Sequence, residues 1–326
     1  MAEETFLGID TSNYMTSICL IDNNRNVLFE AKKLLEVNQG KRGLRQSEVV
    51  FQHTKNLPLL FNKAKKQFEN HRISAVAVSK KPRPKEDSYM PVFVPGTSLA
   101  ESIAAILGIP VFYTTHQEGH IASGLFSSDS KPKSNKFLAV HLSGGTSEIL
   151  SVKIEPPGYA VEKIGGTLDL HAGQLIDRIG VQMGLPFPAG SFFEALANKS
   201  KATFDRIPSS VSGLDFHLSG AEAEAKRRLI RNLPEEDIAR AIEHVIASSL
   251  NKAIINAVES GMPKEVLIVG GVAQNQYIQK ILKKHLQDSK IGASLYFAAK
   301  EYSGDNAFGV ANIALNNVMF KPKDNI

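Results

Sequence analysis

Two histidines four residues apart are the feature of this chain that most directly predicts chemistry. His116 and His120 lie in the run Thr-Thr-His-Gln-Glu-Gly-His-Ile. If this segment is helical, the spacing places both imidazoles on one face, about one turn apart. Two neutral imidazoles so placed can bind one divalent metal ion. The alternative interpretation is a pair of ordinary surface or core histidines, which also occur at this spacing.

A zinc protease is a poor match to this run. The protease motif is His-Glu-x-x-His, in which the glutamate next to the first histidine acts as general base. Here Gln117 follows His116, and Glu118 comes one position too late. The pattern therefore favours metal binding without a protease's general base.

Asp305 is the carboxylate that could complete a metal site. It follows Glu301-Tyr-Ser-Gly and is predicted to open the last helix of the chain. One carboxylate oxygen beside two imidazoles suits iron, zinc or manganese. The alternative interpretation is a helix N-cap, a position that aspartate favours.

Three glycine-rich turns could hold a phosphate. Residues 143–147, Ser-Gly-Gly-Thr-Ser, are predicted to join two strands, and residues 188–190, Pro-Ala-Gly, to link two helices. Residues 270–272, Gly-Gly-Val, precede a helix with Asn275 in its first turn. Glycine lets backbone N–H groups approach an anion, and a helix start adds a favourable dipole. A simple tight turn is the alternative for each. The P-loop and dinucleotide-binding motifs are both missing, so we predict a nucleotide site of another class.

The elements that must position these residues repeat along the chain. We predict for the first half strands 5–12, 16–22 and 27–31, helix 47–69, strand 74–79, helix 97–107, strand 109–113 and helix 116–126. We predict for the second half strands 136–143, 148–154 and 159–164, helices 171–183, 190–197, 219–230 and 234–260, strand 266–269, helix 274–286, strand 294–298 and helix 305–319. Each half opens with a three-strand meander and continues with alternating helices and strands.

This repetition indicates an α/β fold built by duplication. We expect two lobes, residues 1–130 and 131–326, with a ligand cleft between them. The histidine pair would follow strand 109–113, near the carboxyl end of a strand, where open α/β sheets place their ligands.

Composition places the chain among ordinary globular proteins. Of its 326 residues, 43% are hydrophobic and 22% charged. Cys19 is the single cysteine, which excludes a disulfide within the chain and suits a reducing compartment. No apolar run reaches membrane-spanning length, and we expect no secretion leader because the N-terminus enters a strand almost at once. We therefore expect a cytoplasmic protein that does not associate with membranes.

The chain is mildly basic, with a formal net charge of +5. Its lysines and arginines concentrate in residues 25–45, 62–66, 80–85, 226–231 and 280–290. Such clusters are typical of solvated faces and also of proteins that meet RNA. Composition alone does not choose between these two interpretations.

Six motifs occur in an order that resembles a known family. They are Gly-Ile-Asp-Thr-Ser, His-x-Glu-Gly-His, Leu-Ser-Gly-Gly-Thr, Gly-Leu-Asp-Phe-His-Leu-Ser-Gly, Gly-Gly-Val-x-x-Asn and Asp-Asn. Over nearly the whole chain they resemble the TsaD/Kae/Qri family of tRNA threonylcarbamoyladenosine synthases, formerly called O-sialoglycoprotein endopeptidases and grouped as peptidase M22-like. The resemblance implies the actin-like/sugar-kinase ATPase fold. It also implies transfer of a threonylcarbamoyl group from its adenylate to N6 of the tRNA adenosine adjacent to the anticodon.

The resemblance also implies site residues, cofactors and partners. The implied metal ligands are His116, His120 and Asp305, and the implied nucleotide-contacting positions are Leu142, Ser143, Gly144, Gly145, Thr146, Asp177, Gly190 and Asn275. For Asp177 the alternative is a surface ion pair with Arg178 or another neighbour. No catalytic residue is assigned. The implied cofactors are one divalent metal, iron or zinc, and ATP or threonylcarbamoyl-adenylate. The implied partners are tRNA, a smaller paralogous subunit and an ATPase subunit.

Several positions depart from the family pattern. The first turn reads Asp-Thr-Ser-Asn13-Tyr14-Met15-Thr where the family usually has Glu-Thr-Ser-Cys-Asp-Glu-Thr. The segment 80–90 replaces the family's Gly-Pro-Gly stretch, and the usual Ser-Gly-Gly-His-Thr is Ser-Gly-Gly-Thr-Ser. The family's Asp-Asp-Ala-Ala-Gly-Glu has become residues 169–174, Asp-Leu-His-Ala-Gly-Gln. These losses of acidic groups predict a divergent paralogue.

Three functions remain open at this point. The first is the tRNA transferase, because a reactive mixed anhydride needs mainly positioning and charge stabilisation. The second is a catalytically weakened paralogue that binds nucleotide and metal and regulates a partner. The third is a carbamoyl-type transferase with a small-molecule acceptor. A basic face around the cleft would favour tRNA, and a closed neutral pocket would favour a small acceptor.

Overall fold

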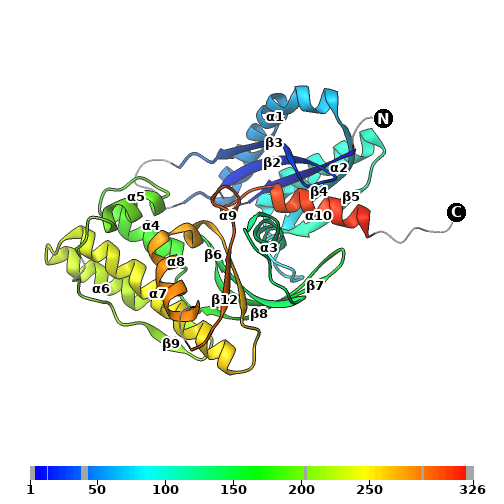
Figure 1. Cartoon of the computed structure of the whole chain (residues 1–326). Helices are drawn as coiled ribbons and strands as arrows, with labels where there is room; N and C mark the ends of the chain where they lie inside the picture. Colours follow the sequence, from blue (N-terminus) through cyan, green and yellow to red (C-terminus); the bar gives the residue numbers. More distant parts are fainter. Residues whose placement is uncertain (1–3, 13, 38–42, 202–203, 288–289, 321–326) are drawn as a thin grey trace.

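The computed structural model describes residues 4–12, 14–37, 43–201, 204–287 and 290–320 (Figure 1). The first sheet contains β1 (Glu4–Thr11), β2 (Met15–Asp22), β3 (Val27–Leu34), β4 (Arg72–Lys81) and β5 (Val111–Thr115). Its order is β3-β2-β1-β4-β5. β1, β2 and β3 form the expected antiparallel meander, and β4 and β5 add in parallel to β1.

The second sheet repeats this arrangement. It contains β6 (Lys136–Leu142), β7 (Ser147–Glu155), β8 (Gly158–Thr167), β11 (Glu265–Val269) and β12 (Ser294–Phe297), extended by β9 (Ser210–Ser212) and β10 (Asp215–His217). Within the order β12-β11-β6-β7-β8-β10-β9, the run β8-β7-β6-β11-β12 matches β3-β2-β1-β4-β5. The predicted duplication of an α/β unit is confirmed. β9 and β10 escaped prediction because three residues are too few to show a period.

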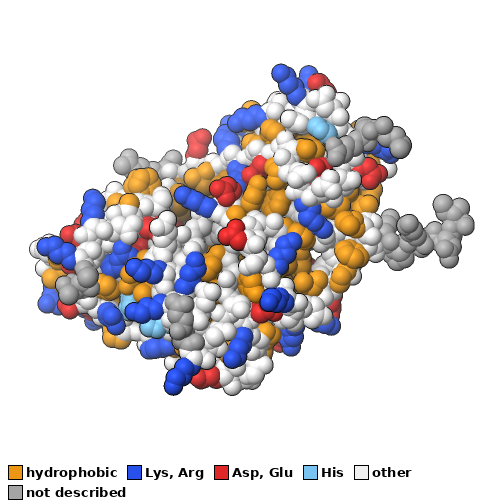
Figure 2. Space-filling view, in the orientation of Figure 1, with side chains coloured by type: hydrophobic (Ala, Val, Ile, Leu, Met, Phe, Trp, Pro, Cys, Tyr) orange, Lys and Arg blue, Asp and Glu red, His pale blue; other side chains and the backbone are white. Residues whose placement is uncertain are grey.

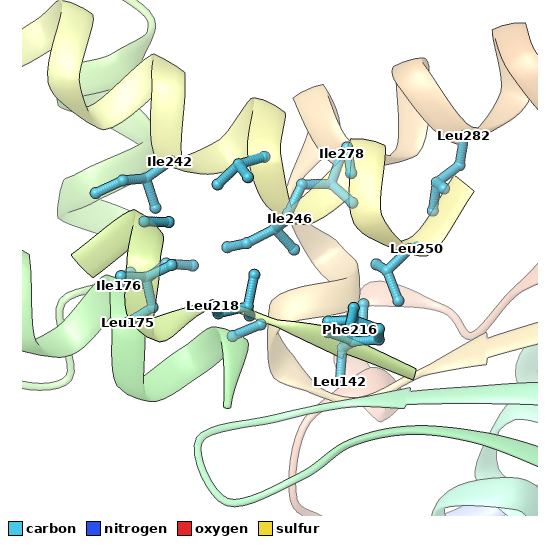
Figure 3. Close-up of a cluster of buried hydrophobic side chains, with 14 of the residues drawn as sticks. Leu142, Leu175, Ile176, Phe216, Leu218, Ile242, Ile246, Leu250, Ile278 and Leu282 are labelled. Atoms are coloured by element: carbon cyan, nitrogen blue, oxygen red, sulfur yellow. The ribbon is translucent and has the colours of Figure 1, made fainter. Parts of the chain in front are cut away.

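Helices cover the outer face of each sheet. α1 (Gln46–Asn70) and α2 (Val94–Leu107, after a 3-10 turn at Pro91–Phe93) pack on the first sheet. The buried positions of α1, which include Val49, His53, Leu57, Leu60 and Ala64, recur every three or four residues, so this helix presents one apolar stripe. α4 (Ala172–Gln182), α5 (Gly190–Ala197), α6 (Ser219–Ile230), α7 (Glu235–Glu259) and α8 (Gln276–Leu282) enclose the larger core of the second lobe (Figure 3).

Two helices lie between the sheets, and each packs on the sheet of the other half. α3 (His116–Ser127) follows β5 of the first half, yet its Ile121 and Leu125 pack against Phe137 and Leu267 of the second sheet. α10 (Phe308–Met319) follows β12 of the second half, yet its residues pack against Phe6 and other side chains of the first sheet. Figure 1 shows both helices side by side at the centre of the molecule. The lobes are therefore joined by an exchange of helices.

Three helices differ from the sequence prediction by more than one residue. α2 begins at Val94, three residues before its predicted start at residue 97. The predicted helix 274–286 is a 3-10 turn (Gly271–Gln274), then α8, then a π-helical turn (Lys283–Gln287), because the Asn275 side chain caps α8 by accepting from Ile278 N at 2.9 Å. The predicted start of the last helix at residue 305 is wrong. α9 (Lys300–Ser303) precedes a turn in which Asn306 Oδ1 accepts from Phe308 N at 2.9 Å, so α10 begins at Phe308.

Among the helices that the structure describes, none combines the length and the apolar character needed to cross a membrane. Cys19 lies buried in β2 as a free thiol.

Candidate metal centre and nucleotide cleft

The histidine pair occupies the first turn and a half of α3. β5 ends at Thr115 and α3 begins at His116, so the pair lies at the carboxyl end of a strand, as expected. A capping box starts the helix: Glu118 N donates to Thr115 Oγ1 at 3.2 Å, and Thr115 N donates to Glu118 Oε2 at 2.9 Å. Glu118 is therefore a capping residue. The helix turns both imidazoles to one side, with the two Nε2 atoms 3.1 Å apart.

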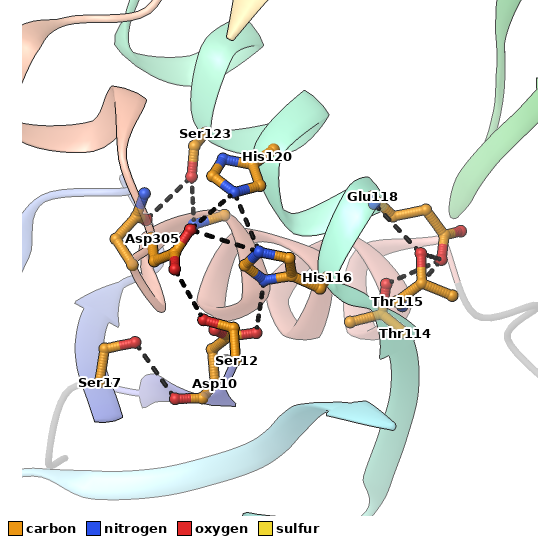
Figure 4. Close-up of polar contacts among 12 residues, drawn as sticks. Asp10, Ser12, Ser17, Thr114, Thr115, His116, Glu118, His120, Ser123 and Asp305 are labelled. Carbon is orange, nitrogen blue, oxygen red and sulfur yellow. Dashed lines mark hydrogen bonds and ion pairs between the residues drawn. The ribbon is translucent and has the colours of Figure 1, made fainter. Parts of the chain in front are cut away.

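Asp305 meets both histidines from the turn before α10 (Figure 4). Its Oδ1 lies 3.4 Å from His116 Nε2 and 3.3 Å from His120 Nε2. Ligand atoms bound to one metal at about 2.1 Å are about 3.0–3.4 Å from each other in octahedral or tetrahedral geometry. These three residues form a cluster with the separations of a single metal site. Asp305 does not cap α10, whose N-cap is Ala307, so the N-cap interpretation is wrong.

The crossing of α3 and α10 brings Asp305 to the histidines. Gly309 N donates to Ser123 Oγ at 3.0 Å, and Ser123 Oγ donates to Asn306 Oδ1 at 2.9 Å. A Cβ added at Gly309 would overlap the carbonyl oxygen of Gly119, so the two helix backbones are in direct contact. The metal centre is therefore assembled across the contact between the lobes, from one residue pair on α3 and one turn next to α10.

Asp10 is a residue of this site to which the sequence analysis assigned no role. It lies near the carboxyl end of β1 with a buried side chain, and its Oδ1 lies 3.1 Å from His116 Nδ1. A carboxylate in this place favours the tautomer with the proton on Nδ1, which leaves the Nε2 lone pair for a metal. Burial by itself would lower the pKa of His116, but Asp10 and Asp305 raise it to about 10. The signal in the sequence was the position of Asp10 in the Gly-Ile-Asp-Thr-Ser motif.

The first turn is held over the metal centre by α1. Ser12 Oγ donates to Asp305 Oδ2 at 3.1 Å, and the Ser12 carbonyl oxygen lies 2.8 Å from Nε2 of the buried His53. Burial lowers the pKa of His53. Tyr14 and Met15 line the cleft, where the family pattern has acidic residues, and Asn13 lies outside the described residues.

A third imidazole lies beside the pair and was missed by the sequence analysis. His141 is buried in β6, with its ring centroid 4.5 Å from that of His120. Neither ring nitrogen of His141, nor Nδ1 of His120, has a partner among the described residues. Burial keeps the pKa of His141 well below its ordinary value, so the ring is neutral. A histidine directly before the Leu-Ser-Gly-Gly turn was the available signal.

One cleft of about 1350 Å³ between the lobes joins the metal centre to the glycine-rich turns. Of the predicted site residues, its lining includes His116, Asp305, Ser143, Gly144, Gly145, Thr146, Asp177, Gly190 and Asn275. Leu142 and His120 are buried and do not belong to the lining of the cleft. A Cβ added at Gly144, Gly145 or Gly190 would meet nothing within 4 Å, so these backbones face open space that a ligand can enter.

Asp177 and Asn275 shape the cleft through their own hydrogen bonds. Asp177 Oδ1 accepts from Ala189 N at 2.7 Å, while Arg178 pairs with Glu222, so an Asp177–Arg178 ion pair is wrong. Burial raises the pKa of Asp177. Asn275 donates from Nδ2 to Glu243 Oε1 at 2.6 Å while its Oδ1 caps α8. Its side-chain amide thus holds the turn at the cleft wall.

Residues 34–312 match the family model described as TsaD, tRNA N6-adenosine threonylcarbamoyltransferase. The chain belongs to the TsaD family. The family and the transferase class that the motifs predicted are therefore confirmed.

Named relatives agree with this assignment at low identity. A tRNA N6-adenosine threonylcarbamoyltransferase of Archaeoglobus fulgidus is 27% identical over 97% of this chain and 91% of its own length. A probable bifunctional tRNA threonylcarbamoyladenosine biosynthesis protein of Methanocaldococcus jannaschii is 26% identical over 95% of this chain. The chain spans 54% of the length of that bifunctional relative.

Solved structures show the same fold. Full-length HypF in its phosphate- and nucleotide-bound form matches 98% of this chain and 47% of its own, with a TM-score of 0.59 and 14% identity. A ROK family glucokinase from Streptomyces griseus, in complex with glucose and AMPPNP, matches 95% of this chain and 98% of its own, with a TM-score of 0.52 and 12% identity. At such identities the likeness concerns the fold, and it confirms the predicted actin-like/sugar-kinase architecture.

Proposed function

We propose that this protein transfers a threonylcarbamoyl group from its adenylate to N6 of the tRNA adenosine adjacent to the anticodon, with one bound divalent metal. The observation that carries the proposal is the convergence of His116, His120 and Asp305 at a cleft that also contains the glycine-rich turns. This arrangement would place a metal at one end of the donor and its nucleotide at the other. Family membership supports the same reaction.

His116, His120 and Asp305 would hold the metal, which we propose to be iron or zinc. When bound, the metal supplies Lewis-acid stabilisation of an oxygen on the donor. Asp10 orients His116 through Nδ1, and Ser12 orients Asp305 through Oδ2. These two contacts fix the ligand side chains before any donor arrives, so little reorganisation accompanies the transfer.

The nucleotide part of the donor, or ATP, would lie against the second lobe. Backbone N–H groups of residues 144–146 would face its phosphate, because Gly144 and Gly145 leave that side open, whereas Ser143 N donates to the Thr146 carbonyl oxygen within the turn. Asp177 lines the same cleft near Gly190 and could accept from ribose hydroxyls. The acyl group would then be held between this wall and the metal ligands.

We propose tRNA as the acceptor, because family membership implies it and the basic character of the chain agrees with it. Figure 2 shows many Lys and Arg side chains over one face of the molecule, and the net charge is +5. Such a surface attracts a polyanion. A smaller paralogous subunit and an ATPase subunit are proposed as partners by family analogy, and lobes at 1–130 and 131–326 remain our proposed division.

The test is threonylcarbamoyl transfer to unmodified tRNA, with the adenylate donor and with family subunits in a parallel reaction. We expect modified tRNA from the wild type and none from His116→Ala. Gly145→Asp adds a negative charge where the phosphate should lie, in open space, so it should lower nucleotide affinity by at least tenfold without changing Tm. Wild-type protein that binds zinc and nucleotide but forms no product would contradict the transferase and favour a regulatory paralogue or a small-molecule acceptor.

A further inference from the structure

Arg83 reaches across the cleft from a segment that departs from the family pattern. It lies in residues 80–90, between β4 and the turn before α2, and lines the cleft. Its Nη2 lies 3.1 Å from Oε1 of Glu148, a residue of β7 whose side chain is 2% exposed. A cation of the first half is thus fixed to a buried carboxylate of the second sheet.

Other contacts hold this pair rigidly. Gln117 Nε2 donates to Glu148 Oε2 at 2.9 Å, and the backbone N of Gln117 donates to the Pro82 carbonyl oxygen at 3.0 Å. The segment that contains Arg83 is therefore tied to α3 next to His116. The guanidinium does not depend on a flexible loop for its position.

The charges around Glu148 do not balance. Lys163 Nζ lies 3.6 Å from the same Oε1, so two cations share one carboxylate. One positive charge is left over at this wall of the cleft, and the Arg83 side chain is 36% exposed.

Arg83 lies between the two places where the donor would be held. On one side, Gln117 directly follows the metal ligand His116. On the other, Glu148 directly follows the 143–147 turn and pairs across the sheet with His141. A donor that extends from the turn to the metal ligands therefore passes Arg83, most of whose N–H groups have no hydrogen-bond partner among the described residues.

We propose that Arg83, positioned by Glu148, is an anion-binding residue that holds an oxyanion of the donor. A guanidinium with free N–H groups is suited to a carboxylate or a phosphate. Both are present in threonylcarbamoyl-adenylate, the first on the threonine and the second next to the ribose. This inference rests on the proposed function, because it assumes that donor.

The test is calorimetric binding of an unreactive analogue of threonylcarbamoyl-adenylate. The analogue is used with its free threonine carboxylate and, separately, as the carboxamide, with AMP as a third probe. Arg83→Gln should weaken binding of the carboxylate form by about 10- to 100-fold, the range of one charge-assisted contact. Lys85→Gln is the matched control, since Lys85 is exposed on the same segment and does not line the cleft, and it should bind as the wild type does.

The probes separate the two sources of the oxyanion. If Arg83 holds the threonine carboxylate, the carboxamide should bind wild type and Arg83→Gln equally. If it holds the phosphate, the substitution should weaken all three probes by the same factor. If Arg83→Gln has a much lower Tm than the wild type, Arg83→Lys replaces it in the test. Lysine keeps the positive charge beside Glu148 but lacks the planar guanidinium, so its affinity for the probe should still fall several-fold.

The inference is overturned if a folded Arg83→Gln binds every probe within twofold of the wild type. A wild type that binds none of the three probes would contradict the proposed function as well. If the wild type binds the probes and only Arg83→Gln loses affinity, the result supports both the proposed function and the role of Arg83.

Discussion

The substitution Gly309→Ala is expected to weaken the metal centre without touching any of its ligands. Gly309 lies where α10 crosses α3, and an added Cβ would overlap the Gly119 carbonyl oxygen and lie 2.7 Å from Ser123 N. Ordinary Cβ contacts begin at about 3.4 Å. To bring the Cβ–Ser123 N distance from 2.7 Å to an ordinary 3.4 Å, α10 must move away from α3 by at least about 0.7 Å near Ser123, and by more near Gly119.

Such a shift is large for a metal site. The histidines are on α3, whereas Asp305 directly precedes Asn306, whose Oδ1 accepts from Phe308 N at the start of α10. Metal–ligand distances tolerate only about ±0.2 Å, so binding would have to force the helices back together. Overpacking costs about 1–3 kcal/mol, and loss of the Gly309–Ser123 hydrogen bond adds about 1 kcal/mol. We expect unfolding free energy to fall by about 2–4 kcal/mol and zinc affinity to fall by about 10- to 100-fold.

The assay combines urea unfolding of the metal-free protein with Zn²⁺ titration against a chelator. Gly220→Ala is the matched control, because Gly220 lies in α6 with open space at its Cβ, and it should stabilise by about 0.5–1 kcal/mol. Gly119→Ala is a milder change, since its Cβ would lie 3.2 Å from a Val310 methyl group that can move. Equal urea midpoints and equal zinc affinities for Gly309→Ala and wild type would refute the reasoning.

Three further predictions address single groups. Asp10→Asn should lower zinc affinity by about tenfold or more in the same titration, because His116 loses the charged partner of its Nδ1. Unchanged zinc affinity would show that Asp10 does not orient His116 for metal binding. Although partial burial opposes it, hydrogen bonds from Ser219, Leu218 and other groups hold the pKa of Asp169 well below its ordinary value. That stabilisation is present above about pH 4 and is lost as pH falls. Asp169→Asn should therefore lower the urea midpoint at pH 7, and this loss relative to the wild type should become smaller as the pH falls below 4. A loss that is the same at every pH would contradict the lowered pKa of Asp169. His141→Leu should raise the Tm of the metal-free protein, because it removes two buried nitrogens that have no partner among the described residues; a lower Tm would show that this ring is satisfied.

The sequence by itself determined the local parts of this protein. The spacing of His116 and His120 required one helix face, because i and i+4 positions are neighbours on any α-helix. Alternating and helical periods likewise placed most strands and helices, and the repeated meander indicated the duplication. The glycine-rich turns were found because glycine and serine at strand ends are recognisable within a few residues.

Only the tertiary structure decided which of these parts meet. Asp305 is 185 positions from His120, and Asp10 is 106 positions from His116, so no local period relates them. Their meeting depends on the exchange of α3 and α10 between the sheets and on the direct backbone contact at Gly309. His141 and Arg83 likewise acquire their surroundings from chain segments far away in sequence. Periodicity describes how one segment folds, whereas the assembly of a site depends on how two lobes pack, and that is a property of the whole chain.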